Sequence, residues 1–390
     1  MDQTLSSQEL VALVERVFQP RAEDRAVAVL IDLPDARVVD HERWRARRAL
    51  AAGWARELKA AHARGESRLE ARLVLYRNAG TNNGDLPPTA WIWEGEELPA
   101  RAEEVTAEPV PFERVFAENQ ILLVPTQFSA TAPMKLHAKR FGFRAATMPG
   151  FTAEMIPALR LDYTEINRRV GILKSLLDEA EEARILFRVD GAREHRLRLD
   201  LRHRTAHASG GLLREPGTAG NLPSGEAYVV PYEGEREGDP SRSAGELPVQ
   251  FGEEIVVYRV ENNRAVSVDE GGQAAKSEAE RLVSEPAYGN LAELGLGVLG
   301  DLGVGATGEV LLDEKLGLHI AFGRSDHFGG QVGAAQFSRP EAVVHIDRVY
   351  IDSLQPRVVV AEADLLMAGG RTVRLMRDGR YTVEFGSVAG

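Results

Sequence analysis

The first half of the sequence alternates apolar strands with helices, and this order constrains the fold more than any other feature. Residues 26–33 (AVAVLIDL) form a nearly continuous apolar segment, which predicts a buried strand before a long Ala/Arg-rich helix over 42–63. Strands that alternate with helices form a parallel sheet with helices on both faces. We therefore expect an α/β N-terminal domain over residues 1–182. The remaining expected strands are 71–76, 120–124 and 144–148, and the remaining helices are 131–141, 151–159 and 162–183.

From about residue 183 onward the second half has a different pattern of predicted secondary structure. Its predicted strands are short, and turn-rich segments such as DGAREH (190–195) and ENNRA (261–265) separate them. A helical pattern returns near residues 273–283. This pattern predicts an α+β C-terminal domain over 183–390 with a largely antiparallel sheet.

Composition and the first residues narrow the class of protein. The chain has 390 residues, of which 44% are hydrophobic and 27% charged, the mixture of a soluble globular protein. No apolar run approaches the roughly 20 residues that a membrane helix needs. Leu10, Leu13, Val14 and Val17 have helical spacing, so we expect an amphipathic helix there and not a signal peptide. A cytoplasmic protein without a membrane partner is predicted.

The absence of cysteine and the net charge exclude further classes. With no cysteine, disulfides, thiolate nucleophiles and cysteine-based zinc or iron–sulfur sites are impossible, so any metal must be held by His, Asp and Glu. The net charge of −12 disfavours binding to a phosphate backbone, and no nucleic-acid partner is expected. The one basic cluster, residues 193–204, alternates with leucines and predicts an exposed strand.

An imidazole and a carboxylate interrupt one of the apolar strands. The segment VVHIDRVYI (343–351) reads as a strand, in which His345 and Asp347 share a face because residues i and i+2 point the same way. A charged carboxylate on an enclosed face is costly unless it is paired or holds a metal. His-x-Asp on one strand face is therefore a candidate pair of metal ligands. A simple His–Asp hydrogen bond on a solvated face is the alternative.

Three more metal-capable residues lie in short apolar or Gly-rich segments. Glu226 precedes an apolar strand, Glu293 lies in NLAELGLG, and His319 lies in LGLHIAFG. Each alone is explained as a hydrogen-bonded buried polar group. Together with His345 and Asp347 they supply three carboxylates and two imidazoles, enough to bridge two divalent cations such as zinc, manganese or cobalt.

Two shorter motifs carry less weight. GLGVLG (295–300) matches the dinucleotide fingerprint, but the helix that should receive a pyrophosphate is replaced by further glycines, which predicts a Gly-rich turn. The three residue types of a serine hydrolase triad occur side by side at Ser325, Asp326 and His327. Adjacent residues rarely have triad geometry, and no G-x-S-x-G elbow accompanies them, so a serine hydrolase is rejected.

The order of these motifs resembles the aminopeptidase T/PepS family of metallopeptidases. The motifs on which the resemblance rests are N-x-P-x-G-E (221–226), a glutamate in a Gly-rich segment, D-E followed by H-I-A-x-G (319–323), and H-x-D. Residues 120–156, with MPG at 148–150, are similar to a segment of the family's N-terminal domain. The resemblance covers roughly residues 120–352.

The resemblance implies both an activity and a ligand set. By it, Glu226, Glu293, His319, His345 and Asp347 match the metal ligands of enzymes that bind two divalent ions and remove N-terminal residues from peptides. It also implies a homodimer and a peptide or aminoacyl substrate. We expect a metal-activated water to attack the carbonyl, with Glu226 or Glu293 as the carboxylate that accepts the proton.

The sequence departs from the family pattern at three positions. The family has a tyrosine seven residues after the H-I-A histidine, and here that position is Asp326. Lys315 replaces the Asn of the family's D-E-N run, and Ala292 replaces the Gly that usually precedes the second glutamate. An ionised Asp326 cannot stabilise an oxyanion, so His327 is the candidate for that role.

Two other functions stay open at the level of the sequence. A ring-cleaving dihydroxypyridine dioxygenase is related to the same family, and Glu293, His345 and Asp347 could form a comparable Fe(II) site with open positions for oxygen. The second alternative is a peptide-binding or tailoring protein that has lost turnover. Glu226 and His319 favour two metals over the oxygenase.

Overall fold

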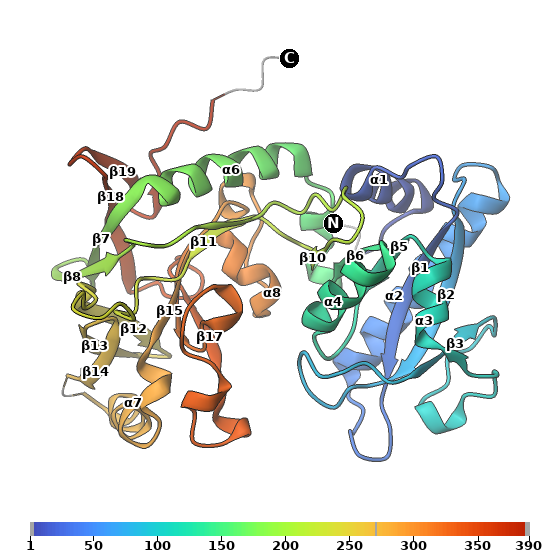
Figure 1. The fold of residues 1–390 in the computed structure, drawn as a ribbon, viewed down its shortest axis with the longest axis horizontal. Helices are drawn as coiled ribbons and strands as arrows, with labels where there is room; N and C mark the ends of the chain where they lie inside the picture. The colour runs from blue at the N-terminus through green and yellow to red at the C-terminus, as the bar shows by residue number, and fades with distance from the viewer. Residues whose placement is uncertain (1–3, 270, 387–390) are drawn as a thin grey trace. The chain divides into compact units, whose positions relative to one another are not determined.

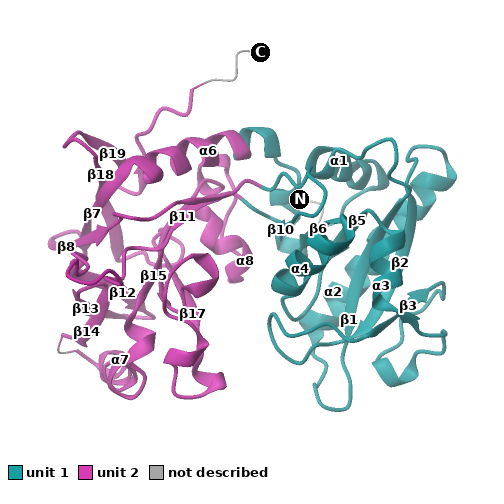
Figure 2. Ribbon diagram, in the orientation of Figure 1, with its two compact units in different colours: residues 1–166, 211–224 teal, residues 167–210, 225–390 magenta. Residues whose placement is uncertain are grey.

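The computed structural model describes residues 4–269 and 271–386, which form two compact units. Unit 1 comprises Met1–Ile166 and Gly211–Ser224, and unit 2 comprises Asn167–Gly210 and Gly225–Gly390 (Figures 1 and 2). Among the described residues, no helix has the length and apolar character that a membrane crossing requires.

Unit 1 is built on a mixed seven-stranded sheet in the order β10-β6-β5-β1-β2-β3-β4. The strands from β10 to β2 are parallel, whereas the edge strands β3 and β4 pair antiparallel. All eight residues of β1 are buried, as expected of a strand covered on both faces. The strands are β1 (Ala26–Leu33), β2 (Glu70–Arg77), β3 (Thr89–Trp93), β4 (Val110–Pro111), β5 (Ile121–Val124), β6 (Arg144–Thr147) and β10 (Ala219–Asn221).

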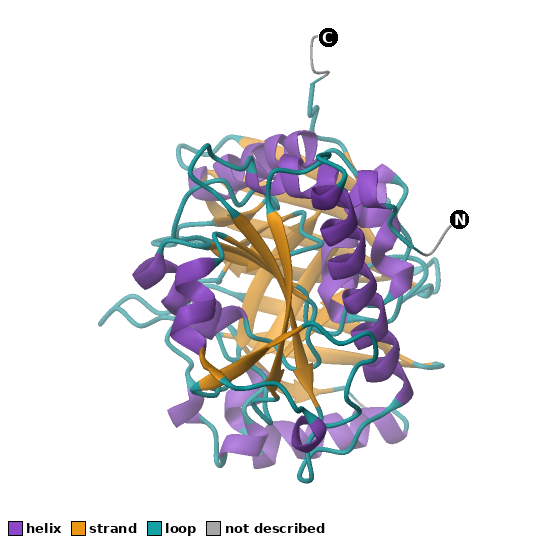
Figure 3. Ribbon diagram, turned by 90° about the vertical axis from the view of Figure 1, so that its right-hand side faces the viewer, coloured by secondary structure: helices purple, strands orange, loops and turns teal. Residues whose placement is uncertain are grey.

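Helices cover both faces of this sheet, and Figure 3 shows its strands running between them. On one face, Ala28 and Leu30 of β1 belong to a core cluster with Phe116 of α3 and Met134 of α4. On the other, α2 packs on β1 and β2 and in turn contacts α1. The helices are α1 (Ser7–Phe18), α2 (Glu42–Ala63), α3 (Phe112–Glu118), α4 (Thr131–Phe141) and α5 (Ile156–Leu159), with 3₁₀ turns at Ala102–Glu104 and Ala153–Met155.

Unit 2 contains two antiparallel sheets. The larger has eight strands in the order β14-β13-β12-β8-β7-β18-β19-β20. Its strands are β7 (Ala180–Val189), β8 (Arg193–Asp200), β12 (Ala244–Phe251), β13 (Glu254–Glu261), β14 (Arg264–Val268), β18 (Val358–Met367), β19 (Thr372–Arg377) and β20 (Arg380–Tyr381).

The smaller sheet of unit 2 has five strands in the order β17-β16-β15-β11-β9. One of its faces is apolar: Phe322 is fully buried there and contacts Tyr258 of the larger sheet and Tyr288. Its strands are β9 (His207–Ser209), β11 (Glu226–Val229), β15 (Leu291–Gly297), β16 (Leu318–Gly323) and β17 (His345–Val349).

The helices of unit 2 are few. α6 (Tyr163–Glu179) begins in unit 1 and continues into unit 2, α7 (Gln273–Ser284) packs on β13 and β14, and α8 (Val310–Asp313) is a single turn. The 3₁₀ turns are η3 (Pro286–Gly289), η4 (Gly300–Leu302), η5 (Glu314–Leu316), η6 (Asp326–Phe328), η7 (Ala334–Gln336) and η8 (Pro340–Ala342).

The predicted fold class is confirmed: an α/β part is followed by a part with largely antiparallel sheet. The domain boundary near residue 182 stays a prediction, whereas the compact units divide after Ile166, and 211–224 return to unit 1 because β10 pairs with β6. The expected helix to residue 183 ends at Glu179. Residues from Ala180 onward pair with β8 and β18 instead, and these contacts override the helical pattern.

A buried ion pair supports a prediction about the stability of unit 1. Arg144 at the start of β6 is 1% exposed and donates to an Asp24 carboxylate oxygen at 2.5 Å and to the Phe18 carbonyl at 2.9 Å. Arg144→Ala leaves Asp24 buried without its cation, so we expect a loss of about 3–5 kcal/mol in urea unfolding.

The control for this prediction is Arg21→Ala, which removes a 39% exposed side chain paired with Glu215. Such a surface pair contributes at most about 1 kcal/mol. Equal losses in the two variants would contradict the prediction.

Candidate metal centre

The five predicted ligands lie on one face of the five-stranded sheet. Glu226 is on β11, Glu293 on β15, His319 on β16, and both His345 and Asp347 are on β17. In the strand register, Glu293 pairs with Ala321, which in turn pairs with Asp347. Side chains at i and i+2 share a face, so neighbouring strands direct these groups to the same side.

An irregularity in β15 contributes to this alignment. The register between β15 and β16 shifts between Leu291 and Glu293, so that Ala292 is the extra residue of a bulge. Bulges re-aim the side chains that follow them. After the bulge the pairing is regular, so Glu293 shares its face with Gly295 at i+2, the residue paired with His319.

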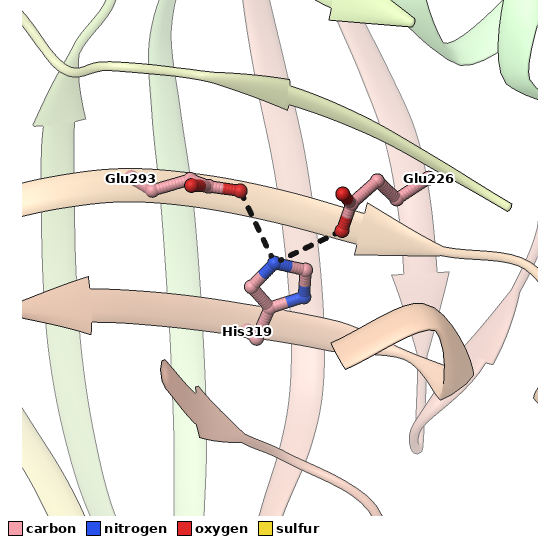
Figure 4. A group of neighbouring side chains, drawn as sticks. All are labelled: Glu226, Glu293 and His319. Carbon is pink, nitrogen blue, oxygen red and sulfur yellow. Dashed lines mark hydrogen bonds and ion pairs between the residues drawn. The ribbon is translucent and has the colours of Figure 1, made fainter. Parts of the chain in front are cut away.

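The first group consists of Glu226, Glu293 and His319, drawn in Figure 4. His319 Nε2 lies 3.3 Å from Glu293 Oε1 and 3.5 Å from Glu226 Oε2, so the imidazole stands between the two carboxylates. The three residues are buried, and the His319 side chain has no exposed surface. Their potential ligand atoms all lie within 4.8 Å of one another, close enough to hold one cation.

The second group consists of Glu293, His345 and Asp347. His345 Nε2 lies 3.3 Å from Glu293 Oε2 and 3.5 Å from Asp347 Oδ1. The His345 side chain is 19% exposed, so this group is the more accessible of the two. Each oxygen of Glu293 therefore faces a different imidazole, and the two groups share this one carboxylate.

Backbone carbonyls fix the orientation of both imidazoles. His319 Nδ1 lies 3.2 Å from the Gly317 carbonyl, and His345 Nδ1 lies 2.8 Å from the Arg324 carbonyl. A carbonyl oxygen only accepts, so Nδ1 carries a proton, and Nε2 is the nitrogen that faces the carboxylates. In the metal-free cluster Nε2 holds a second proton, which a bound cation would replace. This arrangement of a carbonyl behind each imidazole is typical of histidines that bind metals.

Two carboxylate oxygens in the cluster lack hydrogen bonds. Glu226 Oε2 and Asp347 Oδ1 are buried and have no hydrogen-bond partner in the described structure. A buried carboxylate oxygen without a partner is unfavourable, and a divalent cation would satisfy it. The donor set of carboxylate oxygens and imidazole nitrogens suits zinc, manganese, cobalt or iron(II). The residues present therefore fit metal binding, and Glu293 belongs to both candidate groups.

The charges of the cluster shift its pKa values as expected where several carboxylates are buried together without a metal ion. Burial alone would lower the pKa of His319, but the bond to Glu293 and the charges of Glu226 and Glu293 raise it to about 9. The pKa of His345 is raised for the same reason by Asp347 and Glu293, against the effect of burial. Burial raises the pKa of Glu226. The ligands thus attract protons where a metal would supply the positive charge.

Glycines on β15 make room for the cluster. A Cβ at Gly295 would lie 1.9 Å from His319 Nε2, and a Cβ at Gly297 would lie 2.2 Å from the Lys315 carbonyl carbon. The predicted Gly-rich turn at 295–300 is therefore wrong in its first half, because Gly295 and Gly297 are strand residues. Only the following residues, from Gly300, form a 3₁₀ turn.

Lys315 is the cation already present beside the cluster. Its ammonium is 1% exposed, lies 2.5 Å from Glu226 Oε1 and donates a second bond to Glu314. Burial would lower the pKa of Lys315, but Glu226 and Glu314 raise it, so the side chain stays charged. The same burial raises the pKa of Glu314 to about 8.

Asp326 and His327, the predicted catalytic pair, occupy η6, and His327 Nδ1 lies 3.5 Å from Asp326 Oδ1. Asp326 pairs with Arg324 at 2.5 Å, and although burial opposes it, this bond lowers the pKa of Asp326. The His327 ring packs 5.4 Å from the His345 ring and 3.9 Å from Phe328. Partial burial and the nearby charge of His345 lower the pKa of His327. His327 thus lies beside a candidate ligand, whereas Asp326 is held by an arginine.

Sequence reasoning missed two neighbours of the cluster. Tyr228 follows Glu226 at i+2 on β11, stacks on His207 and contacts Phe328. The period-two rule could have placed its ring on the ligand face. Glu314, the second partner of Lys315, had no sequence signal beyond its place in the D-E pair.

Comparisons with known proteins support a relationship at the level of the fold. The sequence matches no protein-family model and no curated protein sequence. The structure is similar to that of 2,5-dihydroxypyridine dioxygenase from Pseudomonas putida KT2440, with a TM-score of 0.59, 15% identity, and coverage of 98% of this chain and 99% of that chain. It is also similar to AmpT from Thermus thermophilus, with a TM-score of 0.54, 16% identity, and coverage of 97% and 99%.

The close approach of His319 to Gly295 yields a test of the first group. Gly295→Ala places a methyl group where the imidazole lies, so we expect zinc affinity measured by calorimetry to fall by at least about tenfold. Gly305→Ala is the matched control, because a Cβ there meets nothing within 4 Å. Equal zinc affinity in both variants would contradict the assigned geometry.

The raised pKa of His319 yields a prediction about pH. A group whose pKa rises on folding, here from 6.5 to about 9, contributes stability that is present below pH 6.5 and lost as the pH rises through 9. We expect the melting temperature of chelator-treated protein to fall between these pH values, and the fall to be smaller in His319→Gln. A fall of the same size in the variant would refute this role of His319.

Proposed function

We propose that this protein is a metal-dependent hydrolase of the aminopeptidase type, which removes the N-terminal residue from a peptide or aminoacyl amide. The observation that carries the proposal is the Glu293 carboxylate, whose two oxygens face His319 and His345 at 3.3 Å each. Glu226 and Asp347 complete the two groups. Such a shared carboxylate suits a pair of divalent cations, of which zinc, manganese and cobalt are the candidates.

A bound pair of cations would polarise the scissile carbonyl and lower the pKa of a water toward neutral. Glu226 is the proposed proton acceptor, because Oε2 is buried and makes no hydrogen bond while Oε1 is held by Lys315. Oε2 has two lone pairs, so one would hold a cation and the other would accept the proton. Burial raises the pKa of Glu226, which favours its holding a proton before passing it to the leaving amine. Glu293 serves as a bridging ligand in this scheme, since each of its oxygens faces an imidazole.

The loop after β16 supplies the proposed contact to the substrate oxygen. His327 lies beside His345, and its lowered pKa keeps the ring neutral with one N–H to donate. Asp326 remains ionised beside Arg324 and is therefore excluded from stabilising a negative charge. We assign His327 the role of hydrogen-bond donor to the developing oxyanion.

A second candidate function is a non-haem iron dioxygenase. Glu293, His345 and Asp347 form a group that is complete without Glu226 and more exposed than the other. Two carboxylates and one imidazole could hold a single Fe(II) with positions open for oxygen and substrate. The fold similarity to 2,5-dihydroxypyridine dioxygenase is consistent with this alternative. The homodimer, the cytoplasmic location, and a peptide-binding protein without turnover stay predictions.

Elemental analysis together with two assays distinguishes the candidates. For the hydrolase we expect zinc, manganese or cobalt in the purified protein and release of amine from aminoacyl amides. One iron per chain with oxygen consumption on a dihydroxypyridine would select the dioxygenase. Tight peptide binding with neither metal nor turnover would select the binding protein.

The role of Glu226 gives the sharpest test of the hydrolase. Glu226→Gln keeps the size of the side chain but cannot accept a proton, so we expect turnover of an aminoacyl amide to fall by about 100-fold or more. Elemental analysis should still find at least one metal per chain, because the Glu293–His345–Asp347 group is intact. Glu237→Gln changes an exposed glutamate and serves as the control. Wild-type turnover in Glu226→Gln would overturn the assignment.

A further inference from the structure

We infer that the two cation positions are unequal: the Glu293–His345–Asp347 group binds the first, tightly held ion, and Lys315 makes the Glu226–Glu293–His319 group the weaker position. This inference rests on the proposed metal centre and extends it, because it states how the site fills as the metal concentration rises. The position of the Lys315 ammonium carries the argument.

The ammonium of Lys315 is fixed in place. It is 1% exposed, lies 2.5 Å from Glu226 Oε1 and is bonded to Glu314 on its other side. Two carboxylates hold it, and a buried lysine has little room to swing away. A divalent ion bound to Glu226 Oε2 would therefore lie close to the Lys315 ammonium, which is bound to Oε1 of the same carboxylate. This fixed positive charge would repel the ion.

Lys315 also limits the number of ligand atoms in the first group. Oε1 of Glu226 has the Lys315 ammonium beside it, which repels an ion from this oxygen, whereas Oε2 makes no hydrogen bond. The favourable ligand atoms of this group are therefore Glu226 Oε2, Glu293 Oε1 and His319 Nε2. An ion there must also shed its water in a fully buried site, since His319 has no exposed surface. Shedding water is costly for a divalent ion.

The second group is less restricted, because the Lys315 ammonium makes no ion pair with its residues. Within the described part of the chain, no lysine or arginine forms an ion pair with Glu293 or Asp347, whose ion-pair partners are the imidazoles His319 and His345. Asp347 Oδ1 makes no hydrogen bond and is available to an ion. The 19% exposure of His345 leaves this side open to solvent, so an ion there can keep a water. We expect it to fill first.

Calorimetric titration of chelator-treated full-length protein with zinc alone tests the inference. In the wild-type protein we expect one tight and one weak binding event that differ by at least about tenfold in affinity. His345→Asn should remove the tight event, and His319→Asn should remove only the weak one. Two events of equal affinity, or loss of the tight event in His319→Asn, would overturn the inference. The titrations of the wild-type protein and of the two histidine variants do not depend on any change at Lys315.

Replacing the lysine tests the cause. Lys315→Met keeps the length of the side chain and removes its charge, so the weak event should tighten by at least about tenfold. Lys315→Arg keeps the charge and should leave the two events unequal. Lys59→Met removes a lysine that pairs with Glu94 in unit 1 and controls for a general loss of positive charge. An unchanged weak event in Lys315→Met would show that the lysine is not the cause.

The outcomes separate this inference from the proposed function. Unequal zinc binding without release of amine from aminoacyl amides would sustain the inference and reject the hydrolase. Equal zinc affinity at the two positions, together with release of amine from aminoacyl amides, would reject the inference and sustain the hydrolase. A wild-type protein that binds no zinc, manganese, cobalt or iron(II) would overturn both.

Discussion

The site depends on one carboxylate, that of Glu293, which is shared between two imidazoles. Its oxygens lie 3.3 Å from His319 Nε2 and 3.3 Å from His345 Nε2, and a backbone carbonyl orients each ring from behind. Without a cation, this arrangement draws protons onto the imidazoles, which is why their pKa values rise. The same concentration of negative charge in a buried place is what a divalent ion would neutralise.

The five-stranded sheet is what allows this carboxylate to be shared. Strands β15, β16 and β17 are neighbours, so residues far apart in the sequence stand side by side on one face. The bulge at Ala292 sets the direction of Glu293, and Gly295 leaves the space that the His319 ring occupies. The opposite face is apolar and packs on the larger sheet through residues such as Phe322, which holds the site face in position.

The sequence was sufficient for the fold class and for choosing five residues that the structure gathers on one sheet face, whereas their role as metal ligands stays a prediction. Apolar periodicity predicts strands and helices, and metal-capable residues inside apolar strands are conspicuous because burial without a partner is costly. The pairing of strands was not predictable. The register that opposes Gly295 to His319, and the 89-residue separation between Glu226 and its partner Lys315, arise from contacts that no local pattern encodes. For the same reason the GLGVLG segment looked like a turn, although its first glycines belong to a strand.

The central claim is that two cations can lie on either side of Glu293. Anomalous diffraction at the zinc absorption edge, from crystals of the full chain soaked in saturating zinc, tests this most directly. The account predicts two peaks, one beside Glu293 Oε1 and His319 Nε2 and the other beside Glu293 Oε2 and His345 Nε2. Zinc peaks only elsewhere in the molecule, with this cluster empty, would contradict it.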